Sequence, residues 1–216
     1  DPVRETNDTL TGIFDIDTTC FIVPATEIII DNRDAGFNMK NSQAETFFGR
    51  FFENKRDMLL QNSFFSIFTT WQSAISSSCY GDEIRDIHYM TATGKGGKAE
   101  WNATLPEDGM YEVWVYNPRQ LLKEVEPVIY EYAQKYTIYA DQVENVEMNL
   151  FREFQGWVTL GKYYFKQGET KVILHDEVYV DESQIKQHTA GMSVDYREEL
   201  YPIVFADAVK WVRVIE

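Results

Sequence analysis

The segment 111–116, which reads Tyr-Glu-Val-Trp-Val-Tyr, contains the side chains best suited to hold a ligand. In a strand, successive side chains point to opposite faces. If the odd-numbered residues face a core, the outward side chains are those of Glu112, Trp114 and Tyr116. A sugar presents flat C–H faces that stack on aromatic rings, and hydroxyl groups that bond to carboxylates and amides. We therefore predict a sugar-binding surface here, with Asn102 of the preceding strand beside it; the alternative is that an insertion covers Trp114.

An early turn gathers oxygen-bearing side chains in a way that suits a hard cation. Asp31, Asn32 and Asp34 follow one another within four positions. Carboxylate and amide oxygens are the ligands that Ca²⁺ prefers, so these residues are a candidate calcium site, and no other cofactor is expected. The alternative is that the three side chains cap their own backbone, as Asx residues commonly do in turns.

Two acidic fragments suggest phosphoryl chemistry. Asp15 and Asp17 lie in Phe-Asp-Ile-Asp-Thr-Thr, which resembles the nucleophile motif of haloacid-dehalogenase phosphatases, and the segment 81–86 resembles their Mg²⁺-holding acidic motif. That fold needs strands and helices in alternation around both motifs. The residues after Ile87 have an antiparallel β pattern instead, so the phosphatase is a remote alternative.

The remaining glycine and histidine features lack the spacing that their chemistry requires. The segment 94–98, Gly-Lys-Gly-Gly-Lys, has no final Ser or Thr as in a phosphate-binding loop, and we expect a hairpin turn. His88, His175 and His188 show no metal-binding spacing; we expect His88 in a strand and His175 in an ion pair with the acids that follow it.

Asp207 lies inside an apolar run, Phe205 to Val209. An unpaired charge buried there would be costly. We therefore expect a hydrogen bond or ion pair from Asp207 to a neighbouring loop rather than a catalytic carboxylate.

The elements that must position these residues are β-strands. Gly156–Phe165 and Lys171–Leu174 are two β-prone runs on either side of a Gly-containing turn, which predicts a hairpin. The remaining predicted strands are 27–31, 87–91, 99–105, 111–116, the pair 136–140 and 146–150, and 203–212. These patterns predict an all-β, antiparallel jelly-roll β-sandwich.

We expect one domain over residues 1–216, because β-sandwiches of this length commonly form a single domain. Residues 1–25 are predicted to be an N-terminal arm, 41–80 an aromatic-rich and partly helical insertion, and 119–132 a charged insertion. Phenylalanines and leucines at helical spacing predict a short amphipathic helix over 44–61.

Composition narrows the classes of partner. The chain has 20 Lys and Arg against 35 Asp and Glu, a formal net charge of −15, which disfavours nucleic acid and acidic membrane surfaces. We find no run of about 18 apolar residues, and we expect no membrane span and no signal peptide in the printed sequence. Cys20 and Cys79 fit either one disulfide in an exported protein or two buried thiols.

The order of several short motifs resembles a known family. The motifs are Ala-Glu-Trp at 99–101, Leu-Pro-x-x-Gly-x-Tyr-Glu-Val at 105–113, Gly-Trp-x-x-Leu-Gly-x-Tyr-x-Phe at 156–165 and Ala-Asp-Ala-Val at 206–209. Together they resemble the golvesin C-terminal-like domain, also called the xanthan-lyase-type carbohydrate-binding-like domain.

That resemblance implies a galactose-binding-domain-like sandwich without catalytic residues. It also implies an extracellular, cell-surface or periplasmic protein whose partners are a glycan and an enzyme that processes polysaccharides or the cell surface. The alternative is a structural or adhesion domain of the cell surface with no glycan ligand.

Overall fold

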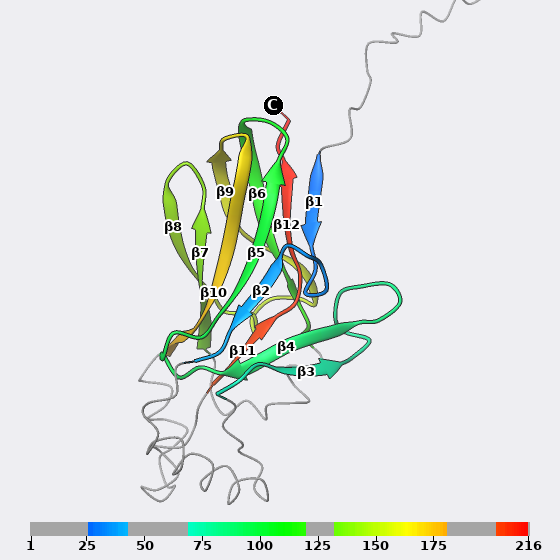
Figure 1. Cartoon of the computed structure of the whole chain (residues 1–216), viewed down its shortest axis with the longest axis vertical. Helices are drawn as coiled ribbons and strands as arrows, with labels where there is room; N and C mark the ends of the chain where they lie inside the picture. Colours follow the sequence, from blue (N-terminus) through cyan, green and yellow to red (C-terminus); the bar gives the residue numbers. More distant parts are fainter. Residues whose placement is uncertain (1–25, 43–68, 120–131, 181–201, 216) are drawn as a thin grey trace, which may run out of the picture.

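The computed structural model describes residues 26–42, 69–119, 132–180 and 202–215, drawn in colour in Figure 1. The strands in this part of the chain are β1 (Glu27–Ile30), β2 (Phe37–Lys40), β3 (Gln72–Ile75), β4 (Asp86–Thr91), β5 (Lys98–Leu105), β6 (Gly109–Asn117), β7 (Tyr132–Tyr139), β8 (Val143–Met148), β9 (Gly156–Phe165), β10 (Gly168–Val180), β11 (Ile203–Ala206) and β12 (Val209–Arg213). The predicted N-terminal arm and the predicted helix over 44–61 lie outside these residues.

The strands form three antiparallel sheets. One has the order β1-β12-β6-β9, the second β2-β5-β10-β7-β8, and the third β11-β4-β3. The four-stranded and five-stranded sheets form the two layers of a sandwich, and the short third sheet lies at one end of it (Figure 1). The predicted all-β, antiparallel jelly-roll sandwich is therefore confirmed.

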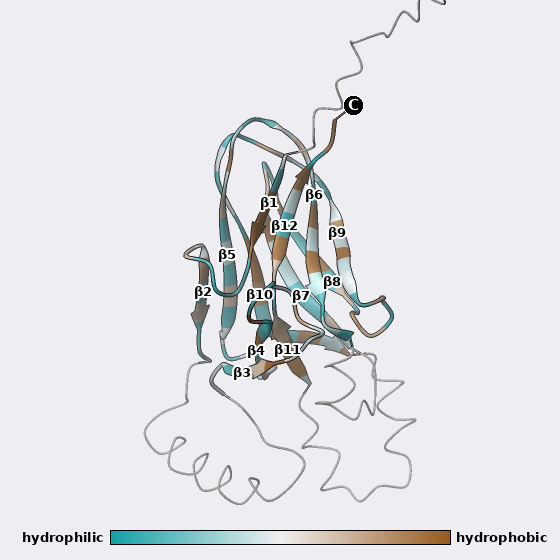
Figure 2. Ribbon diagram, turned by 90° about the vertical axis from the view of Figure 1, so that its right-hand side faces the viewer, coloured by the Kyte–Doolittle hydropathy of each residue, from teal (hydrophilic) through white to brown (hydrophobic). Residues whose placement is uncertain are grey.

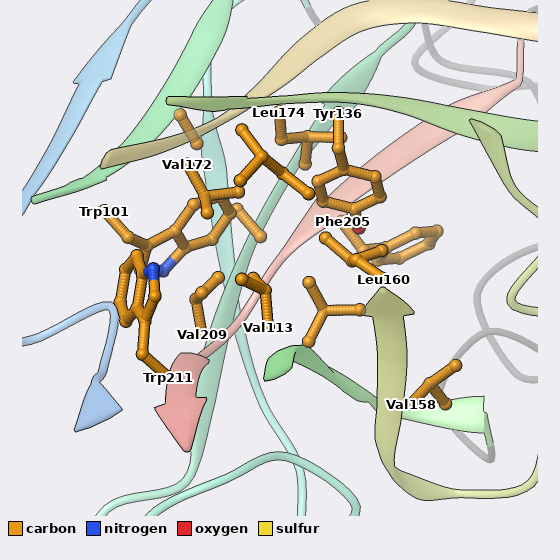
Figure 3. Packing of buried hydrophobic residues seen from close by; sticks show 14 of the residues in the cluster. Trp101, Val113, Tyr136, Val158, Leu160, Val172, Leu174, Phe205, Val209 and Trp211 are labelled. Atoms are coloured by element: carbon orange, nitrogen blue, oxygen red, sulfur yellow. The ribbon is translucent and has the colours of Figure 1, made fainter. Parts of the chain in front are cut away.

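Side-chain alternation along the strands builds the core. In β6, Tyr111, Val113 and Val115 are at most 3% exposed while the residues between them are partly exposed. Figure 2 shows the same alternation as polar and apolar bands along β12, β6 and β9. In Figure 3 the side chains of Trp101 and Trp211, from opposite sheets, point toward one another at one side of the drawn cluster of buried residues.

The strands were predicted more reliably than their pairing. The expected hairpin between β9 and β10 is wrong, because β9 pairs with β6 in one sheet and β10 pairs with β5 and β7 in the other. The expected pair formed by β7 and β8 is confirmed. A turn fixes only that the chain reverses; in a sandwich the next strand can enter either sheet.

The predicted strand over 203–212 is two strands. β11 pairs with β4 in the third sheet, and β12 pairs with β1 and β6 in the four-stranded sheet. Asp207 and Ala208 lie between β11 and β12 and are buried. The chain therefore changes sheet at Asp207.

Asp207 is bonded to two separate parts of the molecule. Its carboxylate accepts the backbone N–H of Tyr80, with N–O distances of 3.1 and 3.3 Å, and its carbonyl accepts Nε1–H of Trp101 at 2.9 Å. The expected bond to a neighbouring loop is thus confirmed. Burial raises the pKa of Asp207 well above its ordinary value, and the one N–H donor opposes this effect only in part.

Asp176 is a second buried carboxylate, and it organises the glycine-rich turn. It accepts hydrogen bonds from the hydroxyls of Ser42 and Thr93 and from the backbone N–H groups of Lys95 and Gly96. This turn is not the expected hairpin, since it leads from β4 in the third sheet to β5 in the five-stranded sheet. Asp176 therefore fastens a crossing between sheets.

The predicted insertions are only partly described. Within 41–80, residues 72–75 form β3 and pair with β4, so this end of the expected insertion belongs to a sheet. Of the charged segment 119–132, residues 120–131 lie outside the described part of the chain, and Tyr132 begins β7.

Replacing Asp207 should separate its two effects on stability. Asp207→Ala leaves the N–H of Tyr80 without its acceptor, and we expect it to lower the free energy of unfolding by about 1–3 kcal/mol. Asp207→Asn keeps an acceptor and has no charge to desolvate, so it should be at least as stable as the wild type at pH 7. Urea unfolding of the three proteins measures this.

The pH dependence of stability tests whether the pKa of Asp207 is raised in the folded state. A carboxyl whose pKa is raised in the folded state binds more protons there than in the unfolded chain, so the contribution of Asp207 to wild-type stability should fall as pH rises above the unfolded value of about 3.9. The advantage of Asp207→Asn should accordingly shrink as pH is lowered toward that value. An advantage that grows with acidification would contradict the raised pKa.

Candidate functional site

The outward face of β6 has the predicted register. Glu112, Trp114 and Tyr116 are partly exposed on the outer side of the four-stranded sheet, with the buried residues of β6 on the other side. Glu112 lies directly opposite Lys162 of β9, and Tyr116 lies opposite Trp157. These side chains therefore share one face, which also includes residues of β9 and β12.

Asn102 does not belong to this face. It lies in β5, which is part of the five-stranded sheet, whereas β6 is part of the four-stranded one. Its Nδ2 donates to the carbonyl of Gly36 at 2.9 Å. The expectation that Asn102 lies beside Trp114 is wrong, because the chain crosses from one layer to the other between β5 and β6.

Three aromatic rings pack together at one end of the outer face. The ring of Tyr116 meets that of Trp157 edge to face, with centroids 5.3 Å apart and planes at 87°. Tyr80, from the loop that Asp207 holds, lies 5.1 Å from Trp157 and 5.5 Å from Tyr116. We call these three residues and the neighbouring Trp114 the aromatic cluster.

A lysine joins the two tryptophans of the aromatic cluster. Nζ of Lys210, in β12, lies 4.6 Å from the ring centroid of Trp157 and 5.7 Å from that of Trp114. The same Nζ forms an ion pair with Glu27 of β1 at 2.7 Å. Such cation–π contacts contribute about 0.5–2 kcal/mol each, so the cluster is internally stabilised as well as partly exposed.

The polar atoms of the cluster differ in what they offer a ligand. Burial, followed by the negative charge of Asp31, raises the pKa of the Tyr80 phenol, and burial likewise raises the pKa of Tyr116. Both phenols therefore stay protonated at neutral pH and can donate a hydrogen bond. Nε1 of Trp114 is buried without a hydrogen-bond partner, so Trp114 offers its ring rather than its N–H.

Sequence reasoning missed three members of this surface. The outward direction of Trp157 could have been predicted from strand alternation, because Val158 and Leu160 face the core. The positions of Tyr80 and Lys210 could not have been predicted in this way, because one comes from an irregular loop and the other meets the tryptophans only through strand pairing between β12 and β6.

The predicted calcium turn is held by its own side chains. The carboxylate of Asp34 accepts the backbone N–H of Asp31 at 2.7 Å, and that of Asp31 accepts the N–H of Asn32 at 2.8 Å. Arg33 adds a positive charge, which forms a bidentate ion pair with Asp86. This arrangement corresponds to the alternative interpretation, in which side chains of the turn cap its own backbone.

One atom still supports a cation at this turn. Oδ1 of Asn32 is buried and has no hydrogen-bond partner, while Nδ2 donates to the carbonyl of Asp86 at 2.7 Å. Within the described part of the chain, however, no three His, Cys, Asp or Glu residues are grouped so as to hold a metal ion. Calcium at Asp31, Asn32 and Asp34 stays a prediction.

The phosphatase alternative is wrong in its fold. Its motifs require a doubly wound sheet, and the described strands form antiparallel sheets. Asp86 of the second fragment is engaged by Arg33 with N–O distances of 2.7 and 2.9 Å, and Asp82 lies exposed in a loop. Asp15 and Asp17 lie outside the described residues.

The two described histidines are neutral strand residues. His88, in β4 as predicted, stacks on Phe37 with ring centroids 5.7 Å apart. His175 contacts the hydroxyl of Thr137 at 2.8 Å, so the expected ion pair with its acidic neighbours is wrong. Burial lowers the pKa of both imidazoles.

Family comparison identifies the class of domain. The model of the Golvesin C-terminal domain family matches residues 58–213, and the chain belongs to this family. The resemblance drawn from the sequence motifs is thereby confirmed. No curated protein matches the chain.

Several solved structures are similar to this chain at low sequence identity. Xanthan lyase from Paenibacillus is 18% identical over 88% of this chain, with a TM-score of 0.53, and the match covers 13% of the xanthan lyase chain. The family 35 carbohydrate-binding module of Cellvibrio japonicus Abf62 is 10% identical over 88% of this chain and 95% of its own, with a TM-score of 0.43. The family 35 carbohydrate-binding module of Clostridium thermocellum is 12% identical over 88% of this chain and 100% of its own, with a TM-score of 0.41.

In the part of the chain that the structure describes, no helix has the length and apolar character that a membrane span needs.

The calcium prediction is tested by melting. If Ca²⁺ binds the folded turn, millimolar Ca²⁺ should raise Tm relative to EDTA. A Ca²⁺ concentration of 100 times Kd would stabilise the folded state by about 2.7 kcal/mol. Asn32→Ala should abolish this response, although it lowers Tm by itself. Asp82→Ala, which removes an exposed aspartate outside the turn, should keep the response. An unchanged wild-type Tm would show that the turn is capped by its side chains alone.

Proposed function

We propose that this chain is a non-catalytic, exported carbohydrate-binding-like module that acts beside enzymes of polysaccharide or cell-surface processing. Family membership supports the class of module, and the shared fold with a section of a xanthan lyase supports an association with such an enzyme. The aromatic cluster on the outer face of the four-stranded sheet is the observation that carries the proposal.

The chemistry of the cluster fits a sugar. Aromatic rings accept the C–H faces of a pyranose, and edge-to-face packing of Tyr116 on Trp157 fixes both rings before a ligand arrives. The protonated phenols of Tyr80 and Tyr116 can donate hydrogen bonds to sugar oxygens. The carboxylate of Glu112 can accept hydrogen bonds from sugar hydroxyl groups. Ring faces with a few fixed polar groups are what a glycan site requires.

The alternative is a structural or adhesion domain of the cell surface without a glycan ligand. A specific observation favours it: the rings contact one another, and Lys210, which is paired with Glu27, contacts the rings of both tryptophans. Such a cluster is stable without a ligand. Binding measurements on cluster variants decide between the two functions.

Truncating the tryptophans should remove glycan binding at the aromatic cluster. We expect Trp114→Ala and Trp157→Ala each to abolish binding at this surface and so to weaken the signal of the glycans that the wild type recognises on an array. Loss of its cation–π contact should lower the free energy of unfolding of Trp114→Ala by about 0.5–2 kcal/mol. Trp157→Ala also loses its ring contacts with Tyr80 and Tyr116, which contribute about 0.5–1.5 kcal/mol each. Isothermal titration and thermal melting measure the two effects.

Tyr164→Ala is the matched control, because it truncates an aromatic side chain that is 45% exposed on the same strand as Trp157 but outside the cluster. It should bind as the wild type does. Full affinity in the Trp114→Ala, Trp157→Ala double variant would refute the aromatic surface as the site. A wild-type protein that binds no glycan would favour the structural alternative.

A further inference from the structure

We propose that the outer face of the five-stranded sheet is a second glycan-contacting surface, suited to neutral glycans, so that one module holds two glycan chains on opposite faces. This inference rests on the function proposed above. It assigns a role to side chains that lie far from the aromatic cluster.

The surface includes two hollows, which together we call the polar trough. The first has a volume of about 610 Å³, and its polar lining residues are Lys135, Thr137, Asn145, Glu147, His175 and Glu177. The second has a volume of about 520 Å³, and its polar lining includes Asn102, Thr104, Tyr139, Glu169 and Lys171.

Strand geometry places the two hollows in line. Glu169, Lys171 and His175 are separated by even numbers of residues on β10, so their side chains share one face. Thr137 and Tyr139 share that face on β7, which pairs with β10. Six residues on β10 span ~20 Å at ~3.3 Å per residue, which suits an extended saccharide chain rather than a single sugar.

Hydrogen bonds in the first hollow fix which atoms face a ligand. The hydroxyl of Thr137 donates its one proton to Oδ1 of Asn145 at 2.8 Å, so its 2.8 Å contact with Nε2 of His175 must be donated by the imidazole. Burial lowers the pKa of His175 and keeps this ring neutral. Nδ1 of His175 is then an acceptor and Nδ2 of Asn145 a donor, a pair that matches sugar hydroxyls.

The second hollow adds an aromatic ring. Tyr139 is 37% exposed, and Nζ of Lys171 lies 4.7 Å from its ring centroid. Asn102 uses Nδ2 to bind the carbonyl of Gly36, which leaves Oδ1 as an acceptor. A ring with neutral amide and hydroxyl groups around it repeats the chemistry of a sugar site.

The charged residues that line the two hollows favour a neutral glycan over an acidic one. The first hollow is lined by one lysine and two glutamates, and the lysine, Lys135, pairs with Glu177 at 3.4 Å. The second is lined by Lys171 and Glu169. Neither hollow carries excess positive charge, and the whole chain has a formal net charge of −15. A uronate-rich chain would be repelled from both.

Two back-to-back surfaces predict a stoichiometry of two. Packed sheets lie ~10 Å apart and their outer faces point in opposite directions, so one straight saccharide cannot contact both. The protein is titrated with cellohexaose, mannohexaose and xylohexaose, and with hexagalacturonate as the acidic probe. We expect two sites per chain for the best neutral probe, and turbidity with the corresponding polysaccharide through cross-linking.

Variants of each surface identify the sites. Asn145→Ala combined with Tyr139→Ala should reduce the stoichiometry from two to one and abolish turbidity, as should Trp114→Ala on the opposite face. Both side chains replaced in the trough are exposed, so the double variant should stay folded, with Tm lowered only by the loss of the cation–π contact of Tyr139 and the hydrogen bond to Asn145. Tyr179→Ala, which truncates a 55% exposed tyrosine on β10 outside both hollows, is the control and should keep two sites.

The outcomes separate this inference from the proposed function. A single site that Trp114→Ala removes and the trough variant leaves intact would overturn the second surface while the proposed function stands. Binding of hexagalacturonate at the trough would overturn its neutral specificity. A wild-type protein without affinity for any glycan, on the array or in the titrations, would overturn both proposals.

Discussion

A buried carboxylate at the point where the chain changes sheet connects the layers of this protein to its aromatic surface. Asp207 bonds to Trp101 in the core through its carbonyl and to Tyr80 in a loop through its carboxylate. Burying a carboxyl group that has one N–H donor is unfavourable for the charged form, which is why its pKa is raised. The position of Tyr80 in the aromatic cluster depends on this bond, because Tyr80 reaches Tyr116 and Trp157 from a loop fixed there.

The residues that mark the family in the sequence explain why the fold was predictable and the site was not. Trp101, Tyr111 and Phe165 are buried, and the last two meet edge to face with centroids 5.8 Å apart. Gly161 has a φ of +138°, and a Cβ there would lie 2.4 Å from the hydroxyl of Tyr163, so the irregular pairing of β9 with β6 requires glycine. These motif residues maintain the sandwich, whereas Trp157, from the same motif as Gly161, reaches the aromatic cluster.

Alternation along a strand was sufficient to predict which way Trp114 points, since the rule is local. It could not predict the neighbours of Trp114. Asn102 is close in sequence but lies in the other layer, and Lys210, 96 positions after Trp114 in the printed sequence, lies directly opposite it. Each strand enters the sheet in which its inward residues pack best, and that choice depends on contacts between distant segments. The β9–β10 hairpin and the position of Asn102 were mispredicted for this one reason.

The aromatic cluster can stabilise the fold and bind a ligand through the same contacts. Ordering a free side chain at an interface costs roughly 0.5–1.5 kcal/mol, and rings already fixed by Asp207, Lys210 and one another avoid most of that cost when a ligand arrives. The polar trough is prepared differently, because hydrogen bonds rather than ring contacts fix its donors and acceptors. Since the inner faces of both sheets supply the core, the outer faces are free to differ in chemistry. A sandwich built this way can present one aromatic and one polar surface without altering a core residue.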